Sequence, residues 1–233
     1  LRAFYKKSFR MPTFNDLYYA EMGNSKLNPE YTTQYDVGFA YFSPRMKGIL
    51  YEWAVQVDGY RNFVSDKIVA YPKGAQFRWT MLNLGKVHIN GLDAKVSATL
   101  RPLRKLYVTT RLQYTYQQAI DVTNPADTYY RDQIPYIPWN SGSAVVQMDY
   151  GTWGLNYSFI YTGERYNQQE NIIYNHTQPW YTHDLSLQKS FNWKDYKARV
   201  ALEVNNLFSQ DYDVILNYPM PKRNYRLTLT FEM

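Results

Sequence analysis

The chain has 233 residues, a formal net charge of +6 and an aromatic content of 18%. It has no Cys, which excludes disulfides, thiolate metal sites and cysteine nucleophiles, and its basic residues are too dispersed to suggest nucleic-acid binding. No stretch approaches the ~18 consecutive apolar residues that a transmembrane helix needs. This does not exclude a membrane β-barrel, because its strands alternate between apolar and polar residues.

Alternation of apolar and polar residues recurs along the chain and predicts about ten β-strands. The expected strands are 1–10, 33–42, 49–69, 87–100, 105–118, 141–150, 153–166, 180–191, 196–208 and 223–233. In 196–208, for example, Val200 and Leu202 fall on one face, whereas Arg199 and Glu203 fall on the other. No segment carries a 3.6-residue apolar repeat long enough to predict a helix.

The connections between these strands alternate in length. The short connections are 43–48, 101–105, 150–152 and 192–195, and the long ones are 11–32, 71–87, 120–140, 167–179 and 209–222. Such alternation places tight turns at one end of a sheet and long loops at the other, as in outer-membrane barrels. Loops of this length are usually functional.

The two faces of the strands support the same interpretation. The apolar face is aliphatic in the middle, with aromatic residues such as Trp53, Trp153, Tyr161 and Tyr116 towards the strand ends. This pattern is typical of an apolar band with aromatic girdles, and the opposite face is polar enough to line a wet lumen. The sequence therefore predicts an all-β, transmembrane antiparallel β-barrel located in the bacterial outer membrane.

The final strand shows the alternation most regularly. Its apolar set is expected to face lipid, and it comprises Tyr225, Leu227, Leu229, Phe231 and Met233. We predict that this is the barrel-closing strand, because a sheet edge with unpaired backbone groups cannot face hydrocarbon. Leu1 begins within a strand, which suggests that residues 1–233 form the C-terminal part of a larger barrel.

Several segments resemble the TonB-dependent outer-membrane receptors, and the resemblance covers essentially the whole chain. They are "SFRMPTFNDLYYAEMGNSKLNPEYTTQYDVGFAYF", "NLGKVHINGLDAKV", "YTGERY" and "EVNNLFSQDYDVILNYPMPKRNYRLTLTFEM". Each motif is weak alone, and their order and spacing carry the resemblance. The Tyr-rich loops and "NYPMPKRNY" look most like receptors of Bacteroides-type bacteria, in the branch similar to the cobalamin receptor.

The resemblance implies a 22-stranded barrel, of which this chain supplies about ten C-terminal strands, and a plug domain that the chain lacks. It implies import of a scarce, bulky nutrient energised through TonB, with cobalamin ahead of an iron–siderophore or haem. Implied partners are outer-membrane lipid and lipopolysaccharide, the plug and remaining strands, TonB, the barrel-assembly machinery and a surface lipoprotein. A passive ten-strand pore or structural barrel is the alternative, and a soluble β-sandwich is a weaker one.

The sequence contains no catalytic constellation, so no enzyme activity and no cofactor or metal site are predicted. Substrate contact is expected from aromatic, basic and His residues of the loops and upper lumen, because flat rings cover a large ligand and Arg pairs with acceptor groups. These are Arg10, Tyr18, Tyr19, Phe77, Arg78, Trp79, Tyr129, Tyr130, Arg131, Arg165, Tyr166, Tyr174, His176, Trp180 and Tyr218. Asn205, Asn206, Asp211 and Asp93 are expected to fix turns and lumen hydrogen bonds instead.

Overall fold

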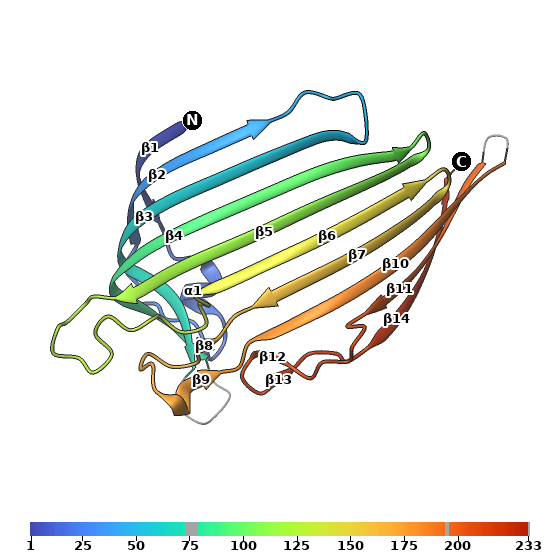
Figure 1. The fold of residues 1–233 in the computed structure, drawn as a ribbon. Coiled ribbons are helices and arrows are strands. Elements are labelled where there is room, and N and C mark those ends of the chain that lie inside the picture. The colour runs from blue at the N-terminus through green and yellow to red at the C-terminus, as the bar shows by residue number, and fades with distance from the viewer. Residues whose placement is uncertain (73–78, 194–195, 233) are drawn as a thin grey trace.

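The computed structural model describes residues 1–72, 79–193 and 196–232. Its main feature is one curved sheet of 10 strands in the order β1-β2-β3-β4-β5-β6-β7-β10-β11-β14 (Figure 1). These strands are β1 (Arg2–Arg10), β2 (Glu30–Phe42), β3 (Leu50–Pro72), β4 (Trp79–Leu103), β5 (Leu106–Asp121), β6 (Asn140–Tyr150), β7 (Trp153–Thr162), β10 (Trp180–Trp193), β11 (Tyr196–Asn205) and β14 (Asn224–Glu232). All ten predicted strands are present as an antiparallel meander.

Short elements lie within the long connections. They are α1 (Phe14–Tyr18), β8 (Arg165–Tyr166), the 3₁₀ turn η1 (Ile173–Asn175), β9 (His176–Thr177), β12 (Asp213–Ile215) and β13 (Tyr218–Pro219). The sequence did not predict α1, although Thr13 and Asp16 form a capping box at its start. None of the helices in the described chain is long and apolar enough to span a bilayer.

Strand pairing places the predicted apolar residues on one face of the sheet. Across β4, β5 and β6, Val96 pairs with Leu112 and Leu112 with Ala144. Across β11 and β14, Leu202 pairs with Leu227. Because side chains alternate between the faces, the intervening polar residues share the opposite face. We call these the apolar face and the polar face.

The apolar face remains largely uncovered. Leu112 is 48% exposed, Leu187 45% and Leu227 63%, although each lies within its strand. No second layer of strands or helices packs on this face within the described residues. A soluble β-sandwich would bury such a face against another sheet, so this arrangement contradicts the sandwich alternative.

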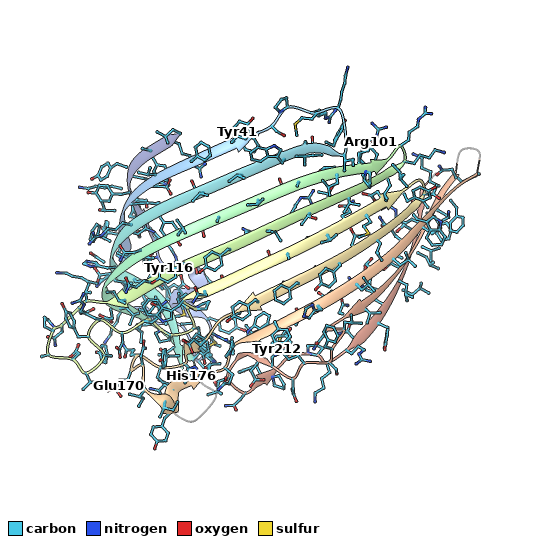
Figure 2. All side chains as sticks on the ribbon, in the orientation of Figure 1. Tyr41, Arg101, Tyr116, Glu170, His176 and Tyr212 are labelled. Atoms are coloured by element: carbon cyan, nitrogen blue, oxygen red, sulfur yellow. The ribbon has the colours of Figure 1, made fainter. Side chains whose placement is uncertain are left out.

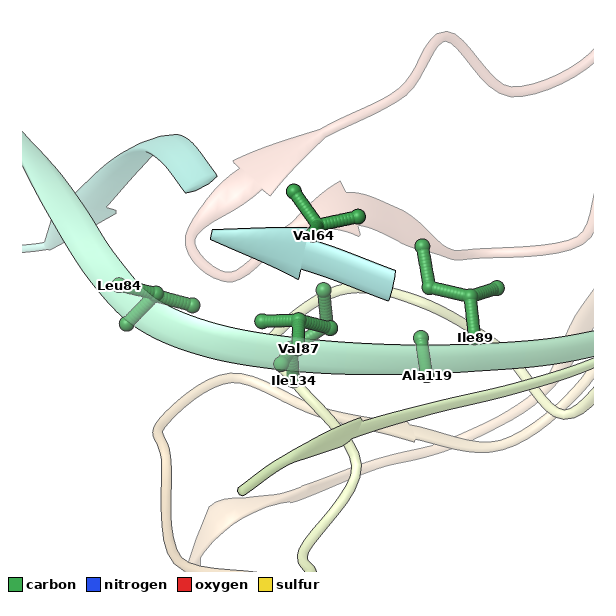
Figure 3. Packing of buried hydrophobic residues seen from close by; sticks show 6 residues of the cluster. All are labelled: Val64, Leu84, Val87, Ile89, Ala119 and Ile134. Atoms are coloured by element: carbon green, nitrogen blue, oxygen red, sulfur yellow. The ribbon is translucent and has the colours of Figure 1, made fainter. Parts of the chain in front are cut away.

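The buried apolar cluster is small and lies near the long-loop end. It comprises Val64, Leu84, Val87, Ile89, Ala119 and Ile134, which come from β3, β4, β5 and the connection 122–139 (Figure 3). Val87 is fully buried at its centre. The cluster anchors the 122–139 connection to the sheet, because burying these side chains removes apolar area from water.

The two ends of the sheet differ as predicted, but the expected long connection 71–87 is wrong in extent, because residues 79–87 belong to β4 and pair with β3. The long connections 11–29, 122–139, 163–179 and 206–223 gather at one end of the strands, and the tight turns lie at the other (Figure 1). The turn 151–152 uses Gly151 at a φ of 60°, which favours glycine.

The sheet is open at both edges. β1 pairs with β2 and β14 pairs with β11, and within the described residues neither edge strand has a second strand partner. The alternative of a complete ten-strand pore requires β1 to pair with β14, and this structure lacks that pairing. The barrel-closing role of Tyr225, Leu227, Leu229 and Phe231 stays a prediction, and Met233 lies outside the described residues.

Candidate functional site at the long-loop end

The connections 163–179 and 206–223 border an open cavity of about 450 Å³ at the long-loop end. One wall is formed by residues 176–180 and the other by residues 211–213 and Leu216. A volume of this size falls within the range of roughly 300–1,000 Å³ that is usual for ligand pockets. Two predicted contact residues, His176 and Trp180, line the cavity (Figure 2 shows His176 and Tyr212).

Aromatic rings form a flat surface in this cavity. Trp180 and Tyr212 are stacked, with ring centroids 4.6 Å apart and an interplanar angle of 27°. The indole Nε1 of Trp180 and the hydroxyl Oγ1 of Thr177 are both buried and have no hydrogen-bond partner within the described chain. Burial raises the pKa of Tyr212, and nearby Asp184 acts in the same direction, so its phenol stays neutral. The stacked ring pair is therefore uncharged, and the two partnerless atoms lie beneath the surface of the cavity.

Two pairs of polar side chains flank the cavity. The imidazole Nε2 of His176 lies 3.2 Å from Oε2 of Glu164, and its ring contacts Tyr166 with centroids 5.8 Å apart. Lys222 forms a 2.9 Å ion pair with Asp211. The cavity's own lining, which is fully described, contains no Lys or Arg.

Arg165 lies beneath the cavity and is 2% exposed. Its Nη2 donates hydrogen bonds to the carbonyl oxygens of Asp213 at 2.8 Å and Val214 at 2.9 Å, and Nη1 donates to that of Gln178 at 3.4 Å. Burial lowers the pKa of Arg165, and Tyr136 and Asp213 act in the opposite direction. Because the guanidinium is enclosed and engaged, this placement does not fit the substrate-contact role predicted for Arg165.

The predicted strand 153–166 is interrupted near Gly163. β7 ends at Thr162, and the chain continues into β8, which pairs with β9 and not with the main sheet. The backbone N–H of Gly163 donates to the carbonyl of Asn140, and a Cβ on Gly163 would lie 2.6 Å from that oxygen. Glycine thus permits the close approach at which the chain leaves the sheet and Arg165 turns inwards.

A second polar network joins the 163–179 connection to 122–139. The side chain of Gln133 is fully buried and bonds the backbone of Ala119, Gln117 and Ile137. Asn171 accepts a hydrogen bond from the Gln133 backbone N–H at 2.8 Å and donates to the Gln133 carbonyl at 3.0 Å. Together with Arg165, these bonds fasten three long connections into one unit.

Asn206 organises the 206–223 connection. Its side chain accepts a hydrogen bond from the backbone N–H of Gln210 and donates to the carbonyls of Gln210 and Pro221. Asn205 and Asn224 are linked through their side chains, and Asp93 accepts a bond from the Thr115 hydroxyl. These contacts confirm the predicted structural role of the motif Asn and Asp residues, whereas Asp211 lines the cavity.

Arg10 is another predicted residue with internal partners. It forms a 2.9 Å ion pair with Asp16 and lies 4.0 Å from Glu30. Burial acts to raise the pKa of Asp16, but hydrogen bonds from Thr13 and Arg10 outweigh it, so the pKa lies below its ordinary value. These contacts fix the start of the 11–29 connection.

The remaining predicted contact residues lie at the same end but do not form one cluster. Tyr18 ends α1, Tyr19 follows it, and both are exposed. Trp79 packs on Tyr136 with ring centroids 5.7 Å apart, and Tyr174 is 90% exposed. The others in described positions are Tyr129, Tyr130, Arg131 and Tyr218, of which Arg131 and Tyr218 are exposed. Phe77 and Arg78 lie outside the described residues.

Sequence reasoning missed Thr177, Tyr212 and Asp213 as parts of the cavity. The Asp-Tyr pair in "NNLFSQDYDV" was recognised, but nothing local indicates that it lies against residues 176–180. The described part of the chain contains no group of His, Cys, Asp and Glu suited to a metal ion.

Comparison with known proteins identifies the family. The family model described as "TonB dependent receptor-like, beta-barrel" matches residues 1–207. The vitamin B12 transporter BtuB of Photobacterium profundum is 25% identical over 228 residues, which cover 96% of this chain and 34% of that protein. BtuB of Vibrio vulnificus is 33% identical over 85 residues, which cover 36% of this chain and 13% of that protein. This chain thus spans about a third of the length of the first of these relatives.

Solved structures with the same fold include several outer-membrane receptors. The copper transporter OprC superposes with a TM-score of 0.68 at 16% identity, covering 98% of this chain and 36% of that one. BauA, the ferric preacinetobactin receptor of Acinetobacter baumannii, gives 0.67 at 15% identity, covering 97% and 33%. Identities this low show the fold alone. Taken with the family model and the open, amphipathic sheet, they establish that the chain belongs to the TonB-dependent receptors, the family of outer-membrane β-barrel receptors and transporters.

Proposed function

We propose that the polypeptide containing this chain imports a scarce, bulky nutrient across the outer membrane with energy supplied through TonB. The proposal concerns transport and not catalysis. Cobalamin is placed ahead of an iron–siderophore or haem. Cobalamin is ranked first because this chain is 25% identical to a vitamin B12 transporter over 96% of its length.

The sheet supports a transport role in a definite way. Its apolar face suits the bilayer, and its polar face carries Arg2, Asp58 and Gln56 in one hydrogen-bonded group. We propose that the polar face lines the lumen of a 22-stranded barrel, in which this chain forms the C-terminal ten strands. A plug domain and the remaining strands would then cover the polar face and the two open edges.

The other proposed partners follow from exposed features. The apolar face meets outer-membrane lipid and lipopolysaccharide, and β14 is the segment that the barrel-assembly machinery would recognise. A surface lipoprotein would contact the long connections. Substrate contact is proposed for the exposed ring and basic side chains of these connections, with His176 and Trp180 first because they share a cavity.

The test is equilibrium binding to the complete receptor, purified from outer membranes in detergent. Cyanocobalamin, haem and a panel of ferric siderophores would be titrated separately. We expect cyanocobalamin to bind with nanomolar affinity and to be taken up by cells only when TonB is present. Failure of the entire panel to bind would refute the proposal, and preference for a siderophore would reverse the order of ligands.

A passive pore remains the second candidate, and it makes the opposite prediction. A pore formed by this chain alone would conduct small ions in planar bilayers without any ligand or TonB. The unpaired edges of β1 and β14 argue against it, because each would expose backbone N–H and C=O groups to lipid.

A further inference from the structure

Three basic side chains interrupt the apolar face near the long-loop end of β1, β3 and β4. Lys7, Arg61 and Lys86 are exposed, and none of them forms an ion pair within the described residues. Alternation places them on the apolar face, because Arg61 is in phase with Val57 along β3 and Lys86 with Leu92 along β4. These cations therefore project towards the surroundings of the barrel and not into its lumen.

The positions around these cations contain no carboxylate. Strand pairing arranges them in three rows across β1 to β4, which are Tyr5–Tyr35–Arg61–Asn90, Lys7–Thr33–Phe63–His88 and Phe9–Tyr31–Ser65–Lys86. We call these rows the outward basic patch. All of its positions are described, and none of them is Asp or Glu. The carboxylates of the same stretch of β2, Glu30 and Asp36, lie on the polar face because they alternate with Tyr31 and Tyr35.

Aromatic pairs on the apolar face place this patch at a definite depth in the bilayer. Tyr41 packs on Trp53 at the short-turn end, with ring centroids 4.9 Å apart, and Tyr31 packs on Phe9 at the long-loop end, with centroids 6.4 Å apart. The stretch of β2 between these pairs rises ~33 Å, or ~23 Å across the bilayer at a tilt of ~45°, which matches the ~25 Å apolar band. Because long loops are extracellular in such barrels, the patch lies at the outer-leaflet boundary.

The side chain of Arg61 bends towards that boundary. Its Cζ lies 5.0 Å from the ring centroid of Phe63, which is one row closer to the long-loop end. The imidazole of His88 packs on the other side of the same pair of strands, with its centroid 4.8 Å from the Phe63 ring. A long basic side chain extends in this way when its charge has a polar or anionic partner near the membrane surface.

The partner of these cations has to come from the bilayer. A further strand beside β1 could reach Lys7, but β3 and β4 are roughly 10 and 14 Å from β1 at the usual strand spacing, which is too far for Arg61 and Lys86. Towards the short-turn end, the patch continues directly into exposed apolar side chains that suit acyl chains. They are Val37 at 60% exposed, Phe39 at 49% and Leu92 at 41%.

We propose that the outward basic patch binds a phosphate group of an outer-leaflet lipid, the phosphorylated headgroup of lipopolysaccharide. Arg61, Lys7 and Lys86 contact the phosphate oxygens, and a guanidinium can bond two of them at once. The acyl chains lie along the apolar side chains next to the patch. The inference deepens the proposed contact with lipopolysaccharide and rests on the proposed placement of the apolar face in the bilayer, but it does not depend on which nutrient is imported.

The test measures lipid binding to the complete receptor, delipidated in detergent with a chelator present so that divalent cations cannot bridge the charges. Lipid A with both phosphates is titrated and the bound lipid is counted by native mass spectrometry. The variants are Arg61→Gln, Lys7→Gln and Lys86→Gln. Lys6→Gln is the matched control, because Lys6 is equally a strand lysine of β1 and is exposed, but it lies on the polar face.

We expect Arg61→Gln to weaken binding of lipid A roughly tenfold and the two lysine variants roughly threefold each, whereas Lys6→Gln should leave it unchanged. Arg61→Lys should fall between the parent and Arg61→Gln, because it keeps the charge and loses the paired donors. Lipid A stripped of its phosphates should bind the parent more weakly, and its affinity should be the same in Arg61→Gln. The comparison of the two lipids needs only the parent receptor, so a variant that folds poorly does not compromise it.

Other results would overturn the inference. Equal binding of lipid A with and without its phosphates would refute the patch as a phosphate site. Displacement of lipid A by millimolar inorganic phosphate would assign the patch to a soluble anion and not to a lipid.

Failure of this inference and failure of the proposed import are separable. If lipid A binds in the predicted manner but the whole nutrient panel fails, the lipid site stands and the import proposal falls. If a nutrient binds and lipid A does not, the import proposal stands and the lipid site falls.

Discussion

Replacing Arg165 by Met should release the 206–223 connection from the rest of the long-loop end. The substitution keeps an unbranched chain of similar length but removes the donors that bond the carbonyls of Gln178, Asp213 and Val214. Three carbonyl oxygens in a nearly closed site would then lose their partner.

The magnitude follows from those bonds. Hydrogen bonds to a charged group contribute roughly 1.5–3 kcal/mol each, and the two short bonds to Asp213 and Val214 dominate, because the bond to Gln178 is long. Part of this is offset, since the variant no longer buries a guanidinium. A net loss of about 3 kcal/mol in the local opening free energy is expected, which is about a hundredfold in the opening equilibrium.

Amide hydrogen exchange of the complete receptor measures this quantity directly. Peptides from 206–223 should exchange about a hundredfold faster in Arg165→Met, whereas peptides from β5 and β6 should be unchanged. The exchange rate of 206–223 in Arg165→Lys should lie between those of the parent and Arg165→Met, because an ammonium group lacks the planar set of donors of a guanidinium. Arg131→Met serves as the control, since Arg131 is an exposed Arg of a neighbouring connection. Equal exchange of 206–223 in Arg165→Met and the parent would refute the clamp.

Three further predictions concern the sheet and the 11–29 connection. Leu112→Arg, on the apolar face in the middle of β5, should lower the free energy of unfolding by roughly 2–4 kcal/mol in lipid, whereas Gln113→Arg on the polar face should cost little. The depressed pKa of Asp16 adds stability to the 11–29 connection that is complete above the unfolded value of 3.8 and is lost as the pH falls through the folded pKa. Exchange within 11–29 should therefore accelerate only in that acidic range, and Asp16→Asn should abolish the dependence. Gly91→Ala should lower the free energy of unfolding by roughly 1–3 kcal/mol, because the new Cβ would lie 2.2 Å from the Tyr60 ring. The same substitution should be less destabilising in a protein that also carries Tyr60→Ser, because the clashing ring is then absent.

The sheet could be predicted from the sequence because its signal is local. Each strand alternates with a period of two, and the same alternation is imposed by the pleat wherever one face meets an apolar environment. The faces containing Leu112 and Leu202 were therefore predictable before any pairing was known. Strand ends were less accurate: β4 begins at Trp79 and not near residue 87, because residues 79–86 continue the hairpin with β3 without clean alternation.

The predicted contact residues show where local patterns fail. Arg165 is basic and lies at a strand end, as the prediction required, but its burial depends on carbonyls about fifty residues later in the chain. Thr177 gave no signal, and Tyr212 stood out only as part of a family-like segment, because the place of both in the cavity arises only where two connections meet. By contrast, the capping box formed by Thr13 and Asp16 is a local signal of the start of α1.

The sequence by itself determined where the strands lie, their two faces and the end that carries the long connections, because each of these depends on residues that are neighbours in the chain. Only the tertiary structure decided which side chains line a cavity and which ones hold its walls. His176 and Trp180 face Asp211 and Tyr212 because Arg165 ties the two connections together. That contact joins residues that are distant in the chain, and no local periodicity encodes it.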